Sequence, residues 1–215
     1  MPRNKYPEET EKKILDASLK LFLEKGYDET TVLDIVANLN GLTRGAFYHH
    51  FKSKEAVLDA LFTHLGKNLP IEAAMSANVA NGLERLKLLF TLSLQSNIAS
   101  NEVTAFMTMI MSLLAEPRFS YKRHDEILST AKVIEPIIAE GMADGSIRKG
   151  SAKAYAEIVL IMTNYWMMPK QFPGTDEDIL ARSELMIEIL DAIGMPVINN
   201  EITNAFHDNI EALDL

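Results

Sequence analysis

The sequence contains no cysteine and no long apolar run. The first absence excludes disulfides and thiolate chemistry. The second excludes an ordinary transmembrane helix, which needs about 18 consecutive apolar residues. The opening segment, MPRNKYPEET, also lacks the apolar stretch of a signal peptide. Since 47% of the 215 residues are nevertheless hydrophobic, we expect a cytoplasmic protein with a buried core, no membrane partner, and one or two domains.

Basic residues are in short supply, with 21 Lys and Arg against 30 Asp and Glu and a net charge of −9. The deficit is uneven: residues 1–64 carry 9 basic and 10 acidic side chains, whereas residues 65–215 carry 12 and 20. Within residues 41–54, GLTRGAFYHHFKSK, there are three basic side chains, two His and no acid. Binding to DNA phosphates needs such cations. The pattern predicts a local basic surface on an acidic chain, although the charges alone also fit an ordinary solvated face.

Catalytic and metal-binding patterns are missing as well. No Ser lies in a nucleophile elbow, and no glycine-rich phosphate loop is present. His49 and His50 are adjacent, so on a helix they point about 100° apart and do not share a metal. The run His124–Glu126 fits a solvated helix face better than a metal or acid–base cluster. We therefore expect no enzyme activity, no metal and no cofactor.

Helical periodicity dominates the N-terminal third. A first helix is predicted from Pro7 to Lys25 and is followed by Gly26 as a cap. Thr31 opens a second helix in a capping-box relation with Asp34, and Asn40-Gly41 forms the next turn. Thr43 caps a third helix over residues 43–50, and Ser53 caps a fourth.

The rest of the chain is also predicted to be helical. Helices are expected near residues 82–99, 102–115, 119–143, 152–168, 176–193 and 200–213, separated by prolines. Pro136 falls inside one of them and should kink or split it. The fold class is therefore all-α with about nine to ten helices. We expect two helical domains, at residues 8–68 and 69–215, joined through a continuous helix that begins after residue 53.

Residues 31–50 read as helix, short turn, helix. In a helix-turn-helix the second helix lies in the major groove, where its early residues meet base edges. Arg44 can pair in a bidentate way with guanine, and Gly45 keeps the helix thin against the groove. The side chains expected to reach bases or phosphates are Thr43, Arg44, Tyr48, His49, Lys52 and Lys54.

The segments KILDASLKLFLEKGYDETTVLDIV and LTRGAFYHHFKSKEAVL together resemble the N-terminal signature of the tetracycline-repressor (TetR) family. The resemblance covers about residues 10–62 and rests on GY-x-x-TT followed by GAFYHHFKSKE. It implies a transcription regulator, most often a repressor, that binds a (pseudo)palindromic double-stranded operator as a homodimer and responds to a small molecule. By this resemblance, residues 8–68 are the DNA-binding domain and residues 69–215 the ligand-binding and dimerisation domain. By similarity, the family's DNA-contacting positions are Thr31, Thr43, Arg44, Gly45, Tyr48, His49 and Lys54.

One departure from the family pattern lies between Thr31 and Gly41, where this chain is one residue longer than the commonest spacing. A slightly longer second helix or a longer turn is expected there.

Two Met-rich and aromatic stretches, VTAFMTMIMSLL and IVLIMTNYWMM, suggest an apolar effector cavity between helices, because Met adapts to irregular ligands. Plain core packing is the alternative for each residue taken singly. The acidic surplus of this part favours a cationic or neutral lipophilic effector. The candidate lining residues are Phe90, Leu94, Phe106, Met109, Ile110, Met162, Tyr165 and Trp166.

Dimerisation is predicted through the helices near residues 152–168 and 176–193. The second of these is apolar around more than one face, so one face can pack inside the subunit and another against a partner. Two other functions stay open: a DNA-bound adaptor controlled by a protein partner, and an all-helical small-molecule carrier or enzyme.

Overall fold

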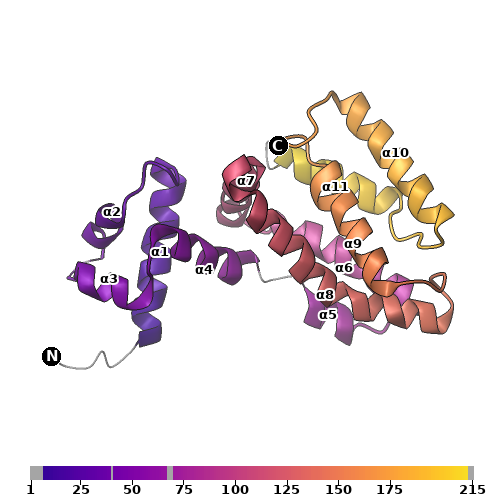
Figure 1. The fold of residues 1–215 in the computed structure, drawn as a ribbon, viewed down its shortest axis with the longest axis horizontal. Helices are drawn as coiled ribbons and strands as arrows, with labels where there is room; N and C mark the ends of the chain where they lie inside the picture. The colour runs from indigo at the N-terminus through magenta and orange to yellow at the C-terminus, as the bar shows by residue number, and fades with distance from the viewer. Residues whose placement is uncertain (1–6, 40, 67–69, 213–215) are drawn as a thin grey trace. The chain divides into compact units, whose positions relative to one another are not determined.

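The computed structural model describes residues 7–39, 41–66 and 70–212. Those residues form eleven α-helices, one 3-10 turn and one π turn, and no strand (Figure 1). The all-α class is confirmed. None of these helices taken singly has the length and apolar character to cross a membrane. The chain divides into two compact units, residues 1–68 and 69–215.

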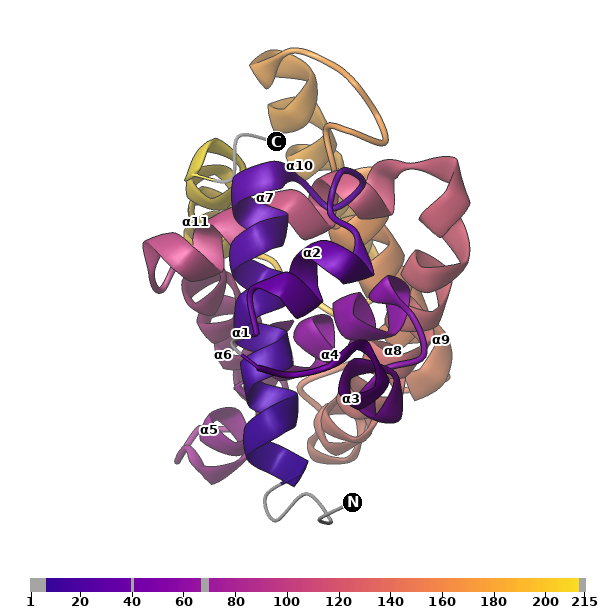
Figure 2. The same cartoon turned by 90° about the vertical axis from the view of Figure 1, so that its left-hand side faces the viewer.

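The N-terminal unit contains α1 (Pro7–Lys25), α2 (Val32–Ala37), α3 (Arg44–His50) and α4 (Lys54–Gly66). α1 packs against both α2 and α4, and Figure 2 looks onto this arrangement. The core forms because apolar residues recur every three or four positions, which places them on one face of each helix. Its fully buried members are Ile14, Phe22, Ile35, Phe47, Val57 and Leu61.

The predicted helix starts of this unit are confirmed. The Thr31 hydroxyl accepts from the Asp34 N–H at 3.2 Å, and the Asp34 carboxylate accepts from the Thr31 N–H at 2.7 Å, which completes a capping box. The Thr43 hydroxyl accepts from the Ala46 N–H at 3.2 Å, and the Ser53 hydroxyl caps α4. Each cap satisfies a backbone donor that the first helical turn leaves without a partner.

The extra residue between Thr31 and Gly41 lies in the turn, because α2 has only six residues and ends at Ala37. The turn is closed by the Leu42 N–H, which donates to the Leu39 carbonyl at 2.8 Å. Gly41 has a φ of 89°, a conformation that side chains with a Cβ rarely adopt. Asn40, the other residue assigned to this turn, lies outside the described residues.

The C-terminal unit forms around α8, which packs most extensively against α9 and also contacts α6. The predicted helices are confirmed to within a few residues, while α5 and η1 were not predicted. The elements are α5 (Ile71–Ser76), α6 (Gly82–Asn97), α7 (Asn101–Ala115), η1 (Pro117–Phe119), α8 (Ser120–Asp144), α9 (Ala152–Ile161), the π turn η2 (Met162–Trp166), α10 (Asp176–Ala192) and α11 (Asn200–Ala212).

Pro136 lies inside α8, which runs from Ser120 to Asp144 without a break, so the expected split is wrong and the expected kink stays a prediction. The proline is exposed, on the side of α8 away from the buried Ile134, Ile137 and Ile138. A missing N–H on the solvent side leaves its i−4 carbonyl to water, and the packed face on the opposite side holds the helix together.

The sequence predicted that the domain boundary falls within a continuous helix after residue 53, and this stays a prediction. α4 ends at Gly66 and α5 begins at Ile71, and the two units divide between Asn68 and Leu69. Residues 67–69 lie outside the described residues.

Candidate DNA-binding and effector sites

Helix α3 presents two chemically different faces. Phe47 is completely buried, and Phe51, directly after the helix, is nearly so. Arg44, Gly45 and Tyr48 are exposed on the other side. The aromatic anchors therefore fix the helix on its unit and leave a polar face free to meet a ligand.

Arg44 is positioned by its neighbour one turn along the helix. Its guanidinium carbon lies 5.5 Å from the centroid of the Tyr48 ring, and the Tyr48 ring packs edge-on against Phe47 at 5.4 Å. Such a cation–π contact is weak at an exposed site, about 0.5–1 kcal/mol. It restricts where the arginine points without occupying its hydrogen-bond donors.

Neither the packing around residue 45 nor its backbone conformation requires a glycine at this position. A Cβ built there would meet only the Thr43 hydroxyl, at an ordinary contact distance of 3.7 Å. Its backbone is helical, so no unusual φ requires glycine either. The open space beside it is what a helix needs if another molecule is to approach its backbone closely.

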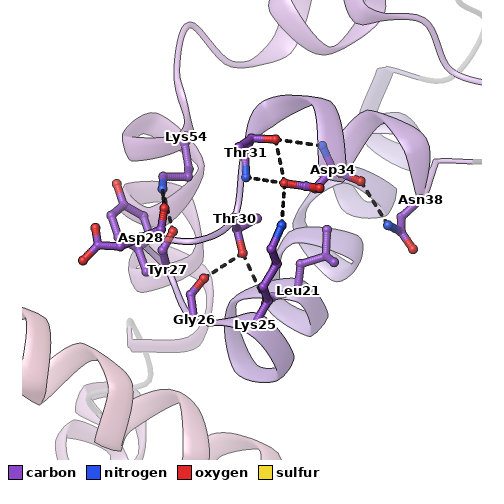
Figure 3. A network of polar contacts seen from close by, with 10 residues as sticks. All are labelled: Leu21, Lys25, Gly26, Tyr27, Asp28, Thr30, Thr31, Asp34, Asn38 and Lys54. Carbon is purple, nitrogen blue, oxygen red and sulfur yellow. Dashed lines mark hydrogen bonds and ion pairs between the residues drawn. The ribbon is translucent and has the colours of Figure 1, made fainter.

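The start of α2 holds a polar network, shown in Figure 3. One oxygen of Asp34 accepts from the Thr31 hydroxyl at 2.6 Å, from the Thr31 N–H at 2.7 Å and from the Lys25 ammonium at 3.0 Å. The Thr31 hydroxyl, then the Thr31 N–H, then Lys25 lower the pKa of Asp34 to about 2. The carboxylate therefore stays charged and ties the end of α1 to the start of α2.

Lys54 has an internal role that the sequence did not reveal. Its ammonium donates to the carbonyls of Tyr27 at 2.5 Å and Asp28 at 3.2 Å, and lies 4.2 Å from the Tyr27 ring centroid (Figure 3). Lys54 thus pins the turn after α1 to the first residue of α4.

The turn between α1 and α2 is also held by Thr30, which the sequence analysis did not single out. Its hydroxyl lies 2.7 Å from the Gly26 carbonyl and 3.3 Å from the Leu21 carbonyl (Figure 3). Thr30 is almost fully buried, whereas Thr31 beside it is exposed. Of these two neighbouring threonines, Thr30 therefore stabilises the buried turn and Thr31 caps α2 at the surface.

The remaining predicted contact residues lie at or after the end of α3. His49 and Lys52 are exposed, and His50 is half-buried. The His49 and His50 rings meet edge-on at 5.4 Å. The structure thus places Thr43, Arg44, Gly45, Tyr48, His49 and Lys52 at the surface of α3 and the residues that follow it.

The candidate effector residues fall into two groups in the C-terminal unit. Met162 belongs to the main core, and Phe90, Leu94 and Trp166 pack against that core while only partly buried. Phe106 and Ile110 are buried, and Met109 half-buried, on α7, outside that core. Tyr165 is 39% exposed.

α9, η2 and α10 each carry large apolar side chains that the unit does not cover. Ile158, Ile161 and Tyr165 follow helical spacing along one face. On α10, Ile179, Met186 and Leu190 are buried, while Leu180, Leu185 and Ile189 are exposed. The predicted two-sided apolar character of this helix is therefore confirmed.

Comparison with known proteins identifies the class. The family described as "Bacterial regulatory proteins, tetR family" matches residues 14–61. The HTH-type transcriptional repressor KstR2 of Mycobacterium tuberculosis is 31% identical over 137 residues, covering 63% of this chain and 68% of the relative. KstR2 of Rhodococcus jostii is 28% identical over 194 residues, covering 85% and 90%. This chain belongs to the TetR family, and its helix-turn-helix makes it a DNA-binding transcription regulator.

Solved structures agree on the fold. A TetR-family transcriptional regulator from Pectobacterium atrosepticum aligns with a TM-score of 0.58 at 22% identity, over 92% of this chain and 100% of that one. NalD of Pseudomonas aeruginosa, the secondary repressor of the MexAB-OprM multidrug efflux pump, aligns with a TM-score of 0.55 at 20% identity, over 96% and 94%.

Proposed function

We propose that this protein is a homodimeric repressor that reads a two-fold-related DNA site through α3 and leaves it when a small molecule binds the C-terminal unit. The observation that carries the DNA-binding part is the outer face of α3. It presents a free guanidinium and an open glycine, held on the unit by buried Phe47.

The roles on this face follow from reach and chemistry. Thr43 and Arg44 are at the start of α3, where a recognition helix meets base edges. Gly45 lets the backbone approach the groove. Tyr48, His49 and Lys52 are exposed donors for phosphates, and Thr31 and Lys54 are the further predicted contacts.

A dimer is part of the proposal because one small helix-turn-helix makes few contacts with DNA. Two DNA-binding units are needed for tight and specific binding to one site. The exposed apolar residues of α9 and α10 supply a surface that a second copy would cover. Large exposed patches of apolar side chains commonly mark interaction sites.

Repression is supported by the relatives. KstR2 and NalD are both named as repressors. A ligand can release the operator only if it binds one arrangement of the dimer better than the other.

The decisive experiment is selection of bound duplexes from a random pool, followed by footprinting of the enriched site. We expect a two-fold-related sequence with half-sites about 34–36 Å apart or at a longer interval. Arg44→Ala should lose about 1–3 kcal/mol of binding free energy and relax the preference at one base pair.

Arg118→Ala is the matched control, since Arg118 is an exposed arginine in the C-terminal unit. It should bind as the unmodified protein does. A folded protein that enriches no sequence would refute the proposal.

A further inference from the structure

Arg123, in the second turn of α8, is a buried cation. Only 8% of it is exposed. Its Nη2 is buried and has no hydrogen-bond acceptor in the described part of the chain. The guanidinium carbon lies 5.5 Å from the centroid of the Tyr165 ring. Burying an unpaired guanidinium costs free energy, so we expect a hydrogen-bond acceptor to bind at this position.

The carboxylate that interacts electrostatically with Arg123, Glu126 of the same helix, is an incomplete counterion. Glu126 lies one turn after Arg123, and burial raises its pKa to about 7, with Arg123 opposing that rise. Because its pKa is raised to about 7, Glu126 is only partly ionised near neutral pH and offsets the charge of Arg123 only in part.

A small hollow is lined in part by Arg123. It is lined by Met111 of α7, Arg123 of α8, and Met168, Pro169, Lys170 and Gln171 of the turn that follows η2. A second lining group lacks a partner: the Gln171 side-chain nitrogen is buried with no acceptor among the described residues. Two residues that each carry a buried donor without an acceptor among the described residues therefore line one hollow.

The lining contains two cations and no acid. The acidic surplus of the C-terminal unit, which by itself favours cationic or neutral ligands, contributes no residue to this lining. The other walls are Met111, Met168 and Pro169, which offer apolar and adaptable contact surface.

We propose that this hollow binds the carboxylate of an organic acid, with Arg123 and Gln171 as donors and the apolar body of the acid lying on Met111 and Met168. A carboxylate accepts two parallel hydrogen bonds from one guanidinium, which makes it a matched partner for a single buried arginine. The inference rests on the proposed function, since the acid would be the effector.

The position of the hollow would allow a bound acid to affect the predicted dimer surface. Arg123 is near the start of α8, and Gln171 follows η2, the π turn that continues α9. An acid held by both residues would join α8 to the end of the helix whose exposed face we assign to the dimer. Single π turns within helices are frequent at functional sites.

The test is a thermal-shift and calorimetric titration of the full chain with butyrate, octanoate, decanoate and benzoate, beside 1-octanol, octanamide and inorganic phosphate. We expect at least one longer or aromatic acid to bind, and its matched alcohol or amide to bind at least tenfold more weakly. Phosphate should not compete. Arg123→Met should weaken the acid at least tenfold, and Gln171→Leu by a smaller factor. Lys132→Met, an exposed cation further along α8, should change nothing.

The ligand-free protein provides a second readout. Arg123→Met should keep or raise the melting temperature, since it removes a charge that has no acceptor. A large drop would show that the arginine already has a partner within the protein and would overturn the inference. Failure of every acid to bind, equal binding of 1-octanol, or equal binding by Arg123→Met would also overturn it.

DNA binding separates this inference from the function on which it rests. Acids that bind through Arg123 without releasing the operator would leave the carboxylate site standing and refute ligand release. Acids that release the operator equally well from Arg123→Met would support ligand release and refute this site.

Discussion

Single residues carry the clearest separation between stability and function in this protein. Gly45 and Gly41 are close in sequence, yet Gly41 is required by its backbone conformation and Gly45 is not. Arg123 and Lys132 are both cations on α8, yet only Arg123 is buried. Because of these environments, we expect similar substitutions within each pair to differ in their effects on stability or on ligand binding.

Gly45→Ala should stabilise the DNA-free protein by up to about 1 kcal/mol, because alanine is the better helix former. It should also weaken operator binding, since the new methyl group projects from the outer face of α3. Urea denaturation and fluorescence anisotropy on the selected site measure the two effects.

Gly41→Ala is the control of opposite sign. At a φ of 89° a Cβ costs about 1–2 kcal/mol, so this variant should lose stability. If Gly45→Ala bound DNA with unchanged affinity, close approach at this position would be excluded.

Glu126 predicts a dependence of stability on pH. Its folded pKa, about 7, is above the ordinary value of 4.5 because burial disfavours the charge. The stability that it contributes is fully present below pH 4.5 and is lost as the pH rises through 7. Glu126→Gln should therefore raise the melting temperature at pH 8 and leave it nearly unchanged at pH 5.

Asp125→Asn serves as the neighbouring control for this measurement, because Asp125 is exposed. An equal effect of Glu126→Gln at both pH values would contradict burial as the cause.

At the scale of elements, substitutions of the two lysines around the start of α4 should differ in their effects on stability and on DNA binding. Lys52 is exposed, whereas the Lys54 ammonium bonds two carbonyls of the turn after α1. Lys54→Met should lower the free energy of unfolding by on the order of 1 kcal/mol, since hydrogen bonds from charged groups contribute about 1.5–3 kcal/mol and Lys54 is only half-buried.

Lys52→Met should leave stability unchanged, weaken DNA binding for all sequences alike and reduce the salt slope by about 1. Denaturation and salt-dependent anisotropy check both variants. Equal stability of the two would remove the anchoring role of Lys54.

At the scale of the whole molecule, the exposed rows of α9 and α10 predict a dimer. Light scattering at micromolar concentration should give twice the chain mass of 24.0 kDa. The double variant Ile161→Asp, Leu185→Asp should be a folded monomer with much weaker operator binding, because a buried unpaired carboxylate in each row opposes association.

Met75→Asp is the control, because Met75 is 51% exposed on α5 and lies on neither α9 nor α10. A monomeric unmodified protein would refute the dimer.

Most helices were predictable because their signals are local. The caps at Thr31, Thr43 and Ser53 act within three residues, and helical periodicity needs only a short window. α5 was missed because six residues after a proline carry too little periodicity. Pro136 misled because its outcome depends on which side of α8 faces solvent, and only packing decides that.

The sequence by itself determined the class of this protein. The caps, the turn glycine and the buried aromatics of α3 are encoded within residues 14–61, so the helix-turn-helix and its family follow from short segments. The tertiary structure alone decided which polar groups lack partners. Arg123 and Gln171 are 48 positions apart, and they border one hollow only because α9 packs back along α8. Lys54 reaches the turn after α1 for the same reason: long-range packing, not local sequence, sets what a side chain contacts.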